Sequence, residues 1–406
     1  MPPVWKFQCN QIPERHTIWV KAGSAPGCSV PEKQKEGMNM AREFGAKSFN
    51  PETVSFISSG SQPSGLPWKM LNRKLPKNIL LAASDNPSTI EELSIELGIA
   101  VPYMEEEVER LVDATLLKKT GDRYVTDFFI MDKDTQLAIY KSQRQSSPER
   151  SKLLDAIASD SLPQLRDLDI VRNGMSDNDL KWWAVIHLTD DCIQQSGSYT
   201  SIYQPAKRAN GEEWGIIGYE QANLPETCIM NHNGYGWGAD MLWCYTPSDY
   251  GLWDRDEGIS YEDTVFLADI IRNGRNLSSF STSEQRQWKT LENRFAHADG
   301  DGNIIPDVLV IYFDNHEKIR EIWRSHPLYA KVRENVDVAF GKTIEILRKS
   351  ANPVLHDRLR YCASMQILDC RMMTLHDEVD SGRLVPPEDP AHSKIGMFLV
   401  LARAEF

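Results

Sequence analysis

The sequence predicts an α+β protein with two unequal parts. Between residues 74 and 126, apolar residues recur three times at helical spacing and are followed by a short alternating stretch around Gly121-Asp122. From residue 181 onward, strand-like segments rich in tryptophan come first, and segments with helical periodicity follow from about residue 260. We therefore expect a small helical module closed by a hairpin, and a larger, aromatic-rich α+β domain with a helical C-terminal part.

Composition narrows the class of protein. A chain of 406 residues predicts two or three domains, and 41% hydrophobic with 25% charged residues is typical of a soluble globular protein. No apolar run is long enough to cross a bilayer, and the start of the chain lacks the features of a secretion signal. Seven scattered cysteines favour reduced thiols in the cytoplasm, and the net charge of −13 argues against broad attraction to nucleic acid or anionic lipid.

Four regions follow from the periodicity along the chain. They are an irregular N-terminal region (1–70) with short extended pieces near Thr17–Val20 and Thr53–Ile57, the helical module (71–131), a helical connector (132–180) with a turn or hinge at Gln143–Glu149, and an α+β domain (181–406).

The module has the element order of a winged helix-turn-helix. Its predicted helices are Lys74–Ser84, Ser88–Gly98 and Pro102–Leu117, and its hairpin is Lys118–Thr126. Ser88 or Thr89 can cap the second helix, and Gly98 permits the left-handed turn that ends it.

Two stretches of the module resemble bacterial winged-helix transcription regulators. Ile90–Ile99 resembles their second helix and turn, and Glu109–Lys119 resembles the end of their third helix running into the wing. Lys74–Ala82 together with Pro102–Val108 is more loosely similar to regulatory regions attached to some bacterial sigma factors. The resemblance covers residues 72–131 and no other part of the chain.

This resemblance implies a set of binding residues and partners. In winged-helix regulators the start of the third helix enters the major groove and the wing contacts the backbone. Carried over by position, the candidates for base contact are Val101, Pro102, Tyr103, Glu105 and Glu106, and the candidates for phosphate contact are Arg110, Lys118, Lys119 and Arg123. The implied partners are DNA or components of RNA polymerase.

The charge of the module points to a second interpretation. Residues 72–132 contain seven Lys or Arg and twelve Asp or Glu, which gives 7 − 12 = −5. Carboxylates are repelled by phosphates, and Glu105, Glu106, Glu107 and Glu109 all lie on the third predicted helix. A module that docks on a protein and does not bind DNA is therefore the alternative hypothesis.

The larger domain is expected to contain strands in its first part and mostly helices in its second part. Expected strands are Trp182–Leu188, Ser201–Tyr203 paired with Trp214–Tyr219 across Asn210-Gly211, Glu226–Met230, Met241–Tyr245, Asp307–Phe313 and Lys394–Ala402. Expected helices are Tyr261–Asn273, Thr282–Phe295, His316–Arg324, Leu328–Lys349 and Leu355–Val379.

An aromatic cluster is the candidate ligand site of this domain. Six of the chain's 11 tryptophans lie between Trp182 and Trp253. Small-molecule sites are often lined by aromatic rings with a few polar groups, although large aromatic residues fill cores more often. The candidate ligand-binding residues are His232, Tyr235, Trp237, Trp243, Tyr245, Trp253 and Arg255.

Other patterns predict no metal, cofactor or catalytic centre. Asp299–Asn303 begins like a calcium loop, but Ile304 and Val310 occupy the positions of the required glycine and glutamate, so a tight turn is expected. Cys9, His16 and Cys28 lack the paired spacing of a zinc site. The predicted function is a cytoplasmic transcription regulator with a sensing or interaction domain and a possible small-molecule effector, and an oligomer is left open. The alternatives are an interaction protein, or an enzyme or small-molecule binder that uses the 231–255 loops.

Overall fold

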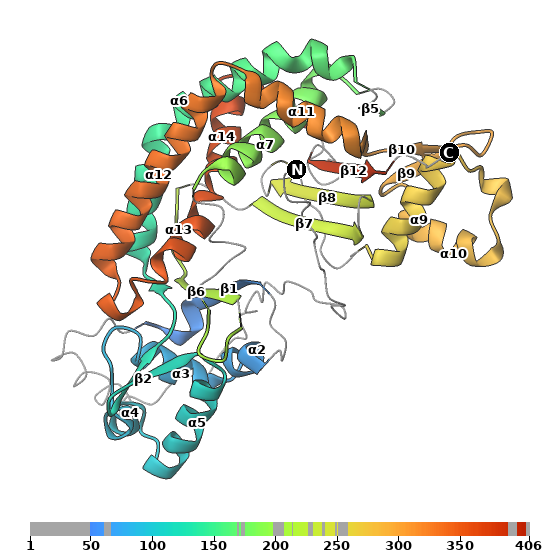
Figure 1. The fold of residues 1–406 in the computed structure, drawn as a ribbon. Helices are drawn as coiled ribbons and strands as arrows, with labels where there is room; N and C mark the ends of the chain where they lie inside the picture. Colours follow the sequence, from blue (N-terminus) through green and yellow to red (C-terminus); the bar gives the residue numbers. More distant parts are fainter. Residues whose placement is uncertain are drawn as a thin grey trace.

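The protein has a mixed α+β fold drawn out along a curved row of long helices (Figure 1). The computed structural model describes residues 49–60, 66–168, 170–171, 175–197, 207–212, 214–225, 230–237, 240–247, 250, 259–388 and 396–402. A small helical module lies at one end of the row, and a mixed sheet lies toward the other end (Figure 1). None of the described helices combines the length and the apolar character that a membrane span requires.

The helical module contains three helices and a hairpin at the predicted segments. They are α3 (Lys74–Ala82), α4 (Ile90–Leu97), α5 (Val101–Asp113), β2 (Leu117–Thr120) and β3 (Arg123–Thr126), and the short helix α2 (Leu66–Leu71) precedes them. Local signals set their ends. Thr89 and Glu92 form a capping box at the start of α4, and Gly98 ends it with φ of 65° in the left-handed region.

The core of this module draws on residues far away in the sequence. Strand β6 (Trp214–Glu220) pairs antiparallel with β1 (Val54–Gly60) and parallel with β4 (Ile130–Met131). The fully buried Trp214 packs in one cluster with Leu80 and Leu111. Of the predicted extended piece Thr53–Ile57, all but Thr53 lies in β1, and Thr53 is the last residue of a preceding 3-10 turn, η2 (Pro51–Thr53).

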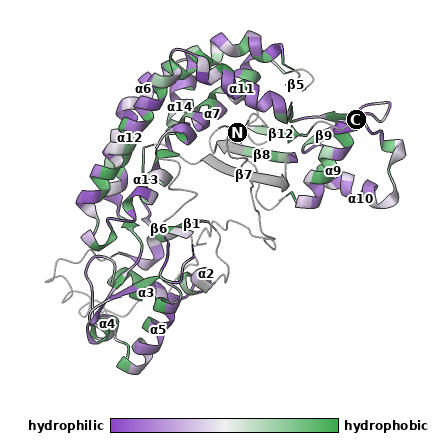
Figure 2. Ribbon diagram, viewed as in Figure 1, coloured by the Kyte–Doolittle hydropathy of each residue, from purple (hydrophilic) through white to green (hydrophobic). Residues whose placement is uncertain are grey.

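Helix α6 (Lys133–Arg166) is continuous, so the predicted hinge at Gln143–Glu149 is wrong. Pro148 removes one helical hydrogen bond, which costs about 3 kcal/mol in an isolated helix. Helices α12 (Tyr329–Ser350) and α14 (Cys370–Asp380) pack along α6 and bury Gln143, Ser147 and Arg150. This packing stabilises the helix so that it continues through the proline. Figure 2 shows polar and apolar residues alternating along α6 and α12, as in amphipathic helices.

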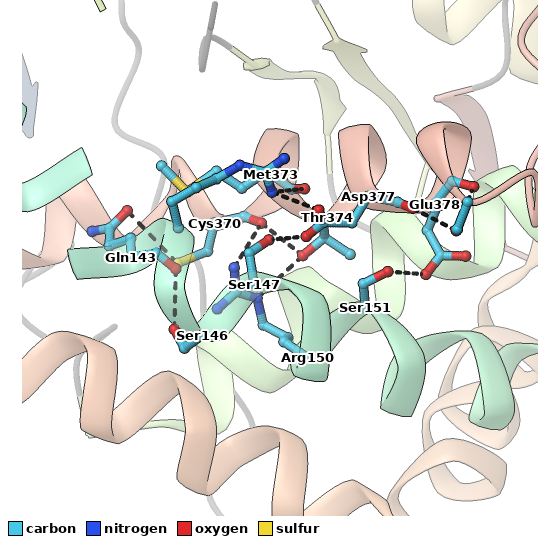
Figure 3. A network of polar contacts seen from close by, with 12 residues as sticks. Gln143, Ser146, Ser147, Arg150, Ser151, Cys370, Met373, Thr374, Asp377 and Glu378 are labelled. Carbon is cyan, nitrogen blue, oxygen red and sulfur yellow. Dashed lines mark hydrogen bonds and ion pairs between the residues drawn. The ribbon is translucent and has the colours of Figure 1, made fainter. Parts of the chain in front are cut away.

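A network of polar side-chain contacts lies between α6 and α14 (Figure 3). The Arg150 guanidinium donates to Thr374 Oγ1 and to Asn335 Oδ1, both at 3.1 Å. The Ser147 hydroxyl donates to Asp377 at 2.5 Å, and the Ser151 hydroxyl donates to Glu378. Hydrogen-bonded partners offset the cost of burying these groups.

The segment predicted as the strand Trp182–Leu188 is helical, and that prediction is wrong. It lies inside α7 (Asp177–Gln195), which begins at a capping box formed by Ser176 and Asp179. Every residue from Trp182 to Ile193 is buried. A helix that is buried on all sides shows a continuous apolar run, which periodicity cannot distinguish from a buried strand.

A five-stranded sheet joins segments from both halves of the larger part. Its order is β5 (Ile170–Val171), β11 (Leu309–Tyr312), β12 (Met397–Leu401), β8 (Asp240–Pro247) and β7 (Met230–Trp237), with β11 and β12 parallel and the other pairs antiparallel. The predicted strands at Met241–Tyr245, Asp307–Phe313 and Lys394–Ala402 are confirmed by β8, β11 and β12 within the described residues, and residues 394 and 395 lie outside them. Ser201–Tyr203 and residues 226–229 lie outside the described residues, as do Thr17–Val20 and the rest of residues 1–48.

Helices cover both faces of this sheet. On one face, Trp183 of α7 and Trp323 of α11 (Phe313–Ser325) pack with Phe398. On the other face, Leu267 of α9 (Tyr261–Arg272) and Trp288 of α10 (Thr282–Leu291) pack with Leu399. The remaining elements are η4 (Leu277–Ser279), the hairpin β9 (Ala296–Ala298) and β10 (Ile304–Pro306), and η5 (Pro353–Leu355).

The predicted helix Leu355–Val379 is divided in the structure, so that expectation is wrong in its extent. After η5, α13 (Leu359–Ile367) packs against α12, whereas α14 packs against α6 and α7. The break at Leu368-Asp369 lets the two helices face different partners.

Candidate functional site

The candidate site is the exposed face of α4 and α5, which we call the α4–α5 surface. Leu93, Met104, Val108 and Leu111 turn into the core, so the opposite side of each helix faces outward. The exposed residues that define this surface are Glu91, Ile95, Glu96, Pro102, Tyr103, Glu105, Glu106, Glu109, Arg110 and Asp113. It contains most of the residues predicted to read DNA bases, and Val101 is half-buried beside them.

Two large apolar side chains protrude from this surface. Ile95 is 83% exposed in the last turn of α4, and Tyr103 is 67% exposed in the first turn of α5. The connection between the helices, Gly98 to Ala100, is only three residues long. Exposed apolar side chains of this size are candidates for contact with a partner where they lie on one binding surface.

The arginines predicted to hold phosphate are already bound to carboxylates. Arg110 forms ion pairs with Glu106 and, at 3.1 Å, with Glu107. Glu107 is buried and also accepts from Arg73 at 2.6 Å.

Arg123 donates two hydrogen bonds, of 2.8 and 2.9 Å, to the Glu92 carboxylate and a third to the carbonyl of Pro87. The backbone N–H of Thr89, and then Arg123, lower the pKa of Glu92. Arg110 and Arg123 thus stabilise the module itself.

The hairpin offers two lysines. Lys118 and Lys119 are exposed on β2, and the Lys119 ammonium lies 5.5 Å from the centre of the Tyr124 ring. No described residue forms an ion pair with either lysine. They are the cations of the predicted site that stay available to a partner.

Carboxylates dominate the α4–α5 surface. No described residue forms an ion pair with Glu91, Glu96, Glu105, Glu109 or Asp113. Partial desolvation raises the pKa of Glu96, as expected for a carboxylate without a nearby cation. The surface therefore carries negative charge that the module does not neutralise.

A buried ionic cluster attaches the module to the helical body. Arg208 donates to the backbone carbonyls of Thr115, Asp127 and Trp214 and to the Asp127 carboxylate. Arg358 reaches the same carboxylate at 3.0 Å from the loop before α13.

Burial lowers the pKa of Arg208 to about 10, and the charge of Asp127 opposes that shift. This cluster could not be predicted from the sequence. Its charged residues are separated by up to 231 positions and form no local pattern.

Of the seven residues in the predicted aromatic ligand site, only Trp243 has a side chain that the structure describes. Trp243 is half-buried and packs against the core cluster that contains Trp183 and Phe398. His232, Tyr235, Trp237 and Tyr245 belong to β7 and β8, where His232 pairs with Tyr245, but their side chains lie outside the description, as do Trp253 and Arg255. The ligand site stays a prediction.

The Asp299–Asn303 pattern forms a turn. Asp299 accepts hydrogen bonds from the side-chain amide of Asn303 and from the backbone N–H groups of Asn303 and Asp301, which shapes the β9–β10 turn and lowers the pKa of Asp299. Within the described part of the chain, no group of three or more His, Cys, Asp and Glu residues is placed to hold a metal ion. Cys9, His16 and Cys28 lie outside it.

Comparison of the chain with protein-family models, curated proteins and solved structures found no match. The case for function therefore depends on the chemistry of the α4–α5 surface.

Proposed function

We propose that the protein is a transcription regulator whose winged-helix module binds a protein of the transcription machinery through the α4–α5 surface. The observation that carries the proposal is the pairing of Arg110 and Arg123 with Glu106, Glu107 and Glu92. Binding to DNA draws much of its affinity from Lys and Arg that neutralise phosphates. Arginines already held by carboxylates are poor at that task, and the carboxylates beside them repel phosphates.

The exposed apolar residues support a protein partner. Binding hot spots in protein interfaces are enriched in tyrosine and arginine surrounded by residues that exclude water. Tyr103 and Ile95 offer such anchors, while Lys118 and Lys119 supply a small positive edge nearby on the chain. Components of RNA polymerase are the first partners to test, and the larger α+β part is the proposed interaction or sensing domain.

The test compares two binding reactions of the full-length protein. Purified RNA polymerase from the source organism is immobilised, and binding is measured for the wild type, for Tyr103→Ala and for Phe313→Ala. Phe313 is 50% exposed on α11 and serves as the matched aromatic control. We expect Tyr103→Ala to weaken binding about tenfold or more, as loss of a hot-spot residue does, and Phe313→Ala to leave it unchanged.

The second reaction measures DNA binding by fluorescence anisotropy with genomic duplexes at about 50 and about 200 mM salt, where phosphate contacts differ strongly. We expect weak binding without sequence preference. Sequence-selective binding that is lost in Lys118→Ala/Lys119→Ala would favour a DNA-reading regulator and contradict the proposal.

A further inference from the structure

The electrostatics of the α4–α5 surface restrict what can bind there. Five of its carboxylates form no ion pair with described residues, and its one arginine is bound to Glu106 and Glu107. A nucleic acid or an acidic protein would bring like charges together. A second copy of this chain, with a net charge of −13, is disfavoured for the same reason.

The spacing of apolar and acidic residues narrows the partner further. Residues three or four apart share one face of a helix, so Glu91 lies beside Ile95 on α4. On α5, Glu105, Glu109 and Asp113 form one row, while Glu106 beside Tyr103 is already paired with Arg110. An arginine guanidinium can stack on an aromatic ring while its N–H groups pair with a carboxylate. A lysine ammonium is a compact, strongly hydrated charge and is less suited to both contacts at once.

We propose that the α4–α5 surface binds an arginine-rich amphipathic helix of a partner protein, with apolar side chains on Ile95 and Tyr103 and arginines on the surrounding carboxylates. This inference rests on the proposed use of the surface for protein contact and adds the chemistry of the partner. The exposed apolar side chains of this surface, and its carboxylates that form no ion pair with described residues, then favour a partner helix that carries both apolar residues and arginines.

Three synthetic helical peptides with one leucine pattern test the proposal. Their polar positions are all arginine, all lysine or all glutamate, and each is titrated against the full-length protein by calorimetry. Site-specific variants are Tyr103→Ala and Glu105→Lys/Glu109→Lys. The matched controls on α12 are Val338→Ala, at another exposed apolar residue, and Glu334→Lys/Asp337→Lys. The second control changes the net charge of the protein by the same amount as Glu105→Lys/Glu109→Lys.

We expect the arginine peptide to bind most tightly and to protect α4 and α5 from hydrogen exchange. Its affinity should fall about tenfold or more in both site-specific variants and stay within about twofold in the controls. An equal loss in Glu334→Lys/Asp337→Lys would show attraction by bulk charge alone and overturn the proposal. Absence of binding, a footprint elsewhere, or displacement of the peptide by a DNA duplex would overturn it as well.

The peptide titration and the polymerase binding assay can fail independently of each other. Polymerase binding that depends on Tyr103 but not on Glu105 and Glu109 would leave the proposed function standing and refute the arginine-rich partner. Site-specific binding of the arginine peptide without binding to polymerase would refute the polymerase and keep the partner chemistry.

Discussion

Single residues in this protein are constrained mainly by neighbours that lie far away in the sequence. Gly215 at the start of β6 faces the ring of Tyr361 on α13, and a Cβ atom placed on Gly215 would lie 2.2 Å from the ring. Asp369 sits at the break between α13 and α14, where burial raises the pKa of its carboxyl from 3.8 to about 7 against the opposing effect of Arg371. Both positions allow a direct test of the packing.

Gly215→Ala should destabilise the protein. The added methyl group collides with a buried ring, and overpacking of this kind typically costs about 1–3 kcal/mol. The matched control is Gly341→Ala in α12, where a Cβ meets nothing within 4 Å and the substitution should stabilise the helix by up to about 1 kcal/mol. Urea unfolding measures both, and equal stabilities for the two variants would contradict the close contact.

Asp369→Asn should make the protein more stable at neutral pH. Because the folded-state pKa is raised, the contribution of the protonated carboxyl is fully present below about pH 4 and is lost as the pH rises through about 7. The asparagine variant avoids that loss. Thermal melts between pH 4 and 8 should show an advantage over the wild type that grows with pH, and a constant difference would speak against a buried carboxyl. Asp357→Asn, at an exposed aspartate, is the control.

At the scale of elements, a network of polar contacts joins α6 and α14 (Figure 3), beside a core cluster that includes Leu154 of α6 and Met373 of α14. The Ser151 hydroxyl donates to Glu378, whose side chain is fully buried, and accepts from Arg383. Burial raises the pKa of Glu378, while Arg383 and Ser151 act in the opposite direction. Directional hydrogen bonds therefore add to apolar packing in fixing how these two helices meet.

Ser151→Ala should destabilise the protein by about 1–3 kcal/mol, since a buried carboxylate loses one of its donors. Ser146→Ala on the same helix is the control, because its partly buried hydroxyl donates only to the carbonyl of Gln143 three residues earlier among the described contacts. Chemical unfolding of both variants provides the measurement. A loss for Ser146→Ala as large as that for Ser151→Ala would show that the seam has no special role.

At the scale of the whole molecule, α6 connects the module to the sheet-containing part. Its 34 residues span about 50 Å at about 1.5 Å per residue. A second connection runs through the buried Asp127, which is shared by Arg208 and Arg358. The module is thereby attached to the body at the start of α6 and through this ionic cluster, and the Asn352 amide also donates to the Asp85 carbonyl at 2.8 Å.

Arg358→Ala should loosen the attachment of the module. It removes one of two cations from a buried carboxylate, which costs about 1–3 kcal/mol. Hydrogen exchange in β2, β3 and the residues around Asp127 should accelerate more than exchange in α7. Asp357→Ala, which removes only an exposed ion pair with Arg358, should change stability by less than about 1 kcal/mol. Uniform acceleration over the whole chain would contradict a local attachment.

Local sequence signals determined the start of several helices, among them α4, α7, α9 and α10, and the hairpin of the module. Thr89, Glu92 and Gly98 act within one or two turns, so α4 could be predicted from neighbouring residues alone. The acidic character of α5 was equally visible, and with it the doubt about DNA. The pairing of Arg110 and Arg123 with carboxylates was not visible, because Arg123 meets Glu92 across 31 residues.

Tertiary structure decided what periodicity leaves open. The residues Trp182–Leu188 form a helix because packing surrounds α7 on all sides, and α6 continues through Pro148 because α12 and α14 pack along it. Strand β6 found its partner in β1, more than 150 residues earlier in the chain. The sequence by itself thus determined local helix starts, turns and surface charge, which depend on neighbours a few residues away. Only folding decided the sheet partners, the buried ion pairs and the charges left exposed on the α4–α5 surface, because these depend on groups brought together across the chain.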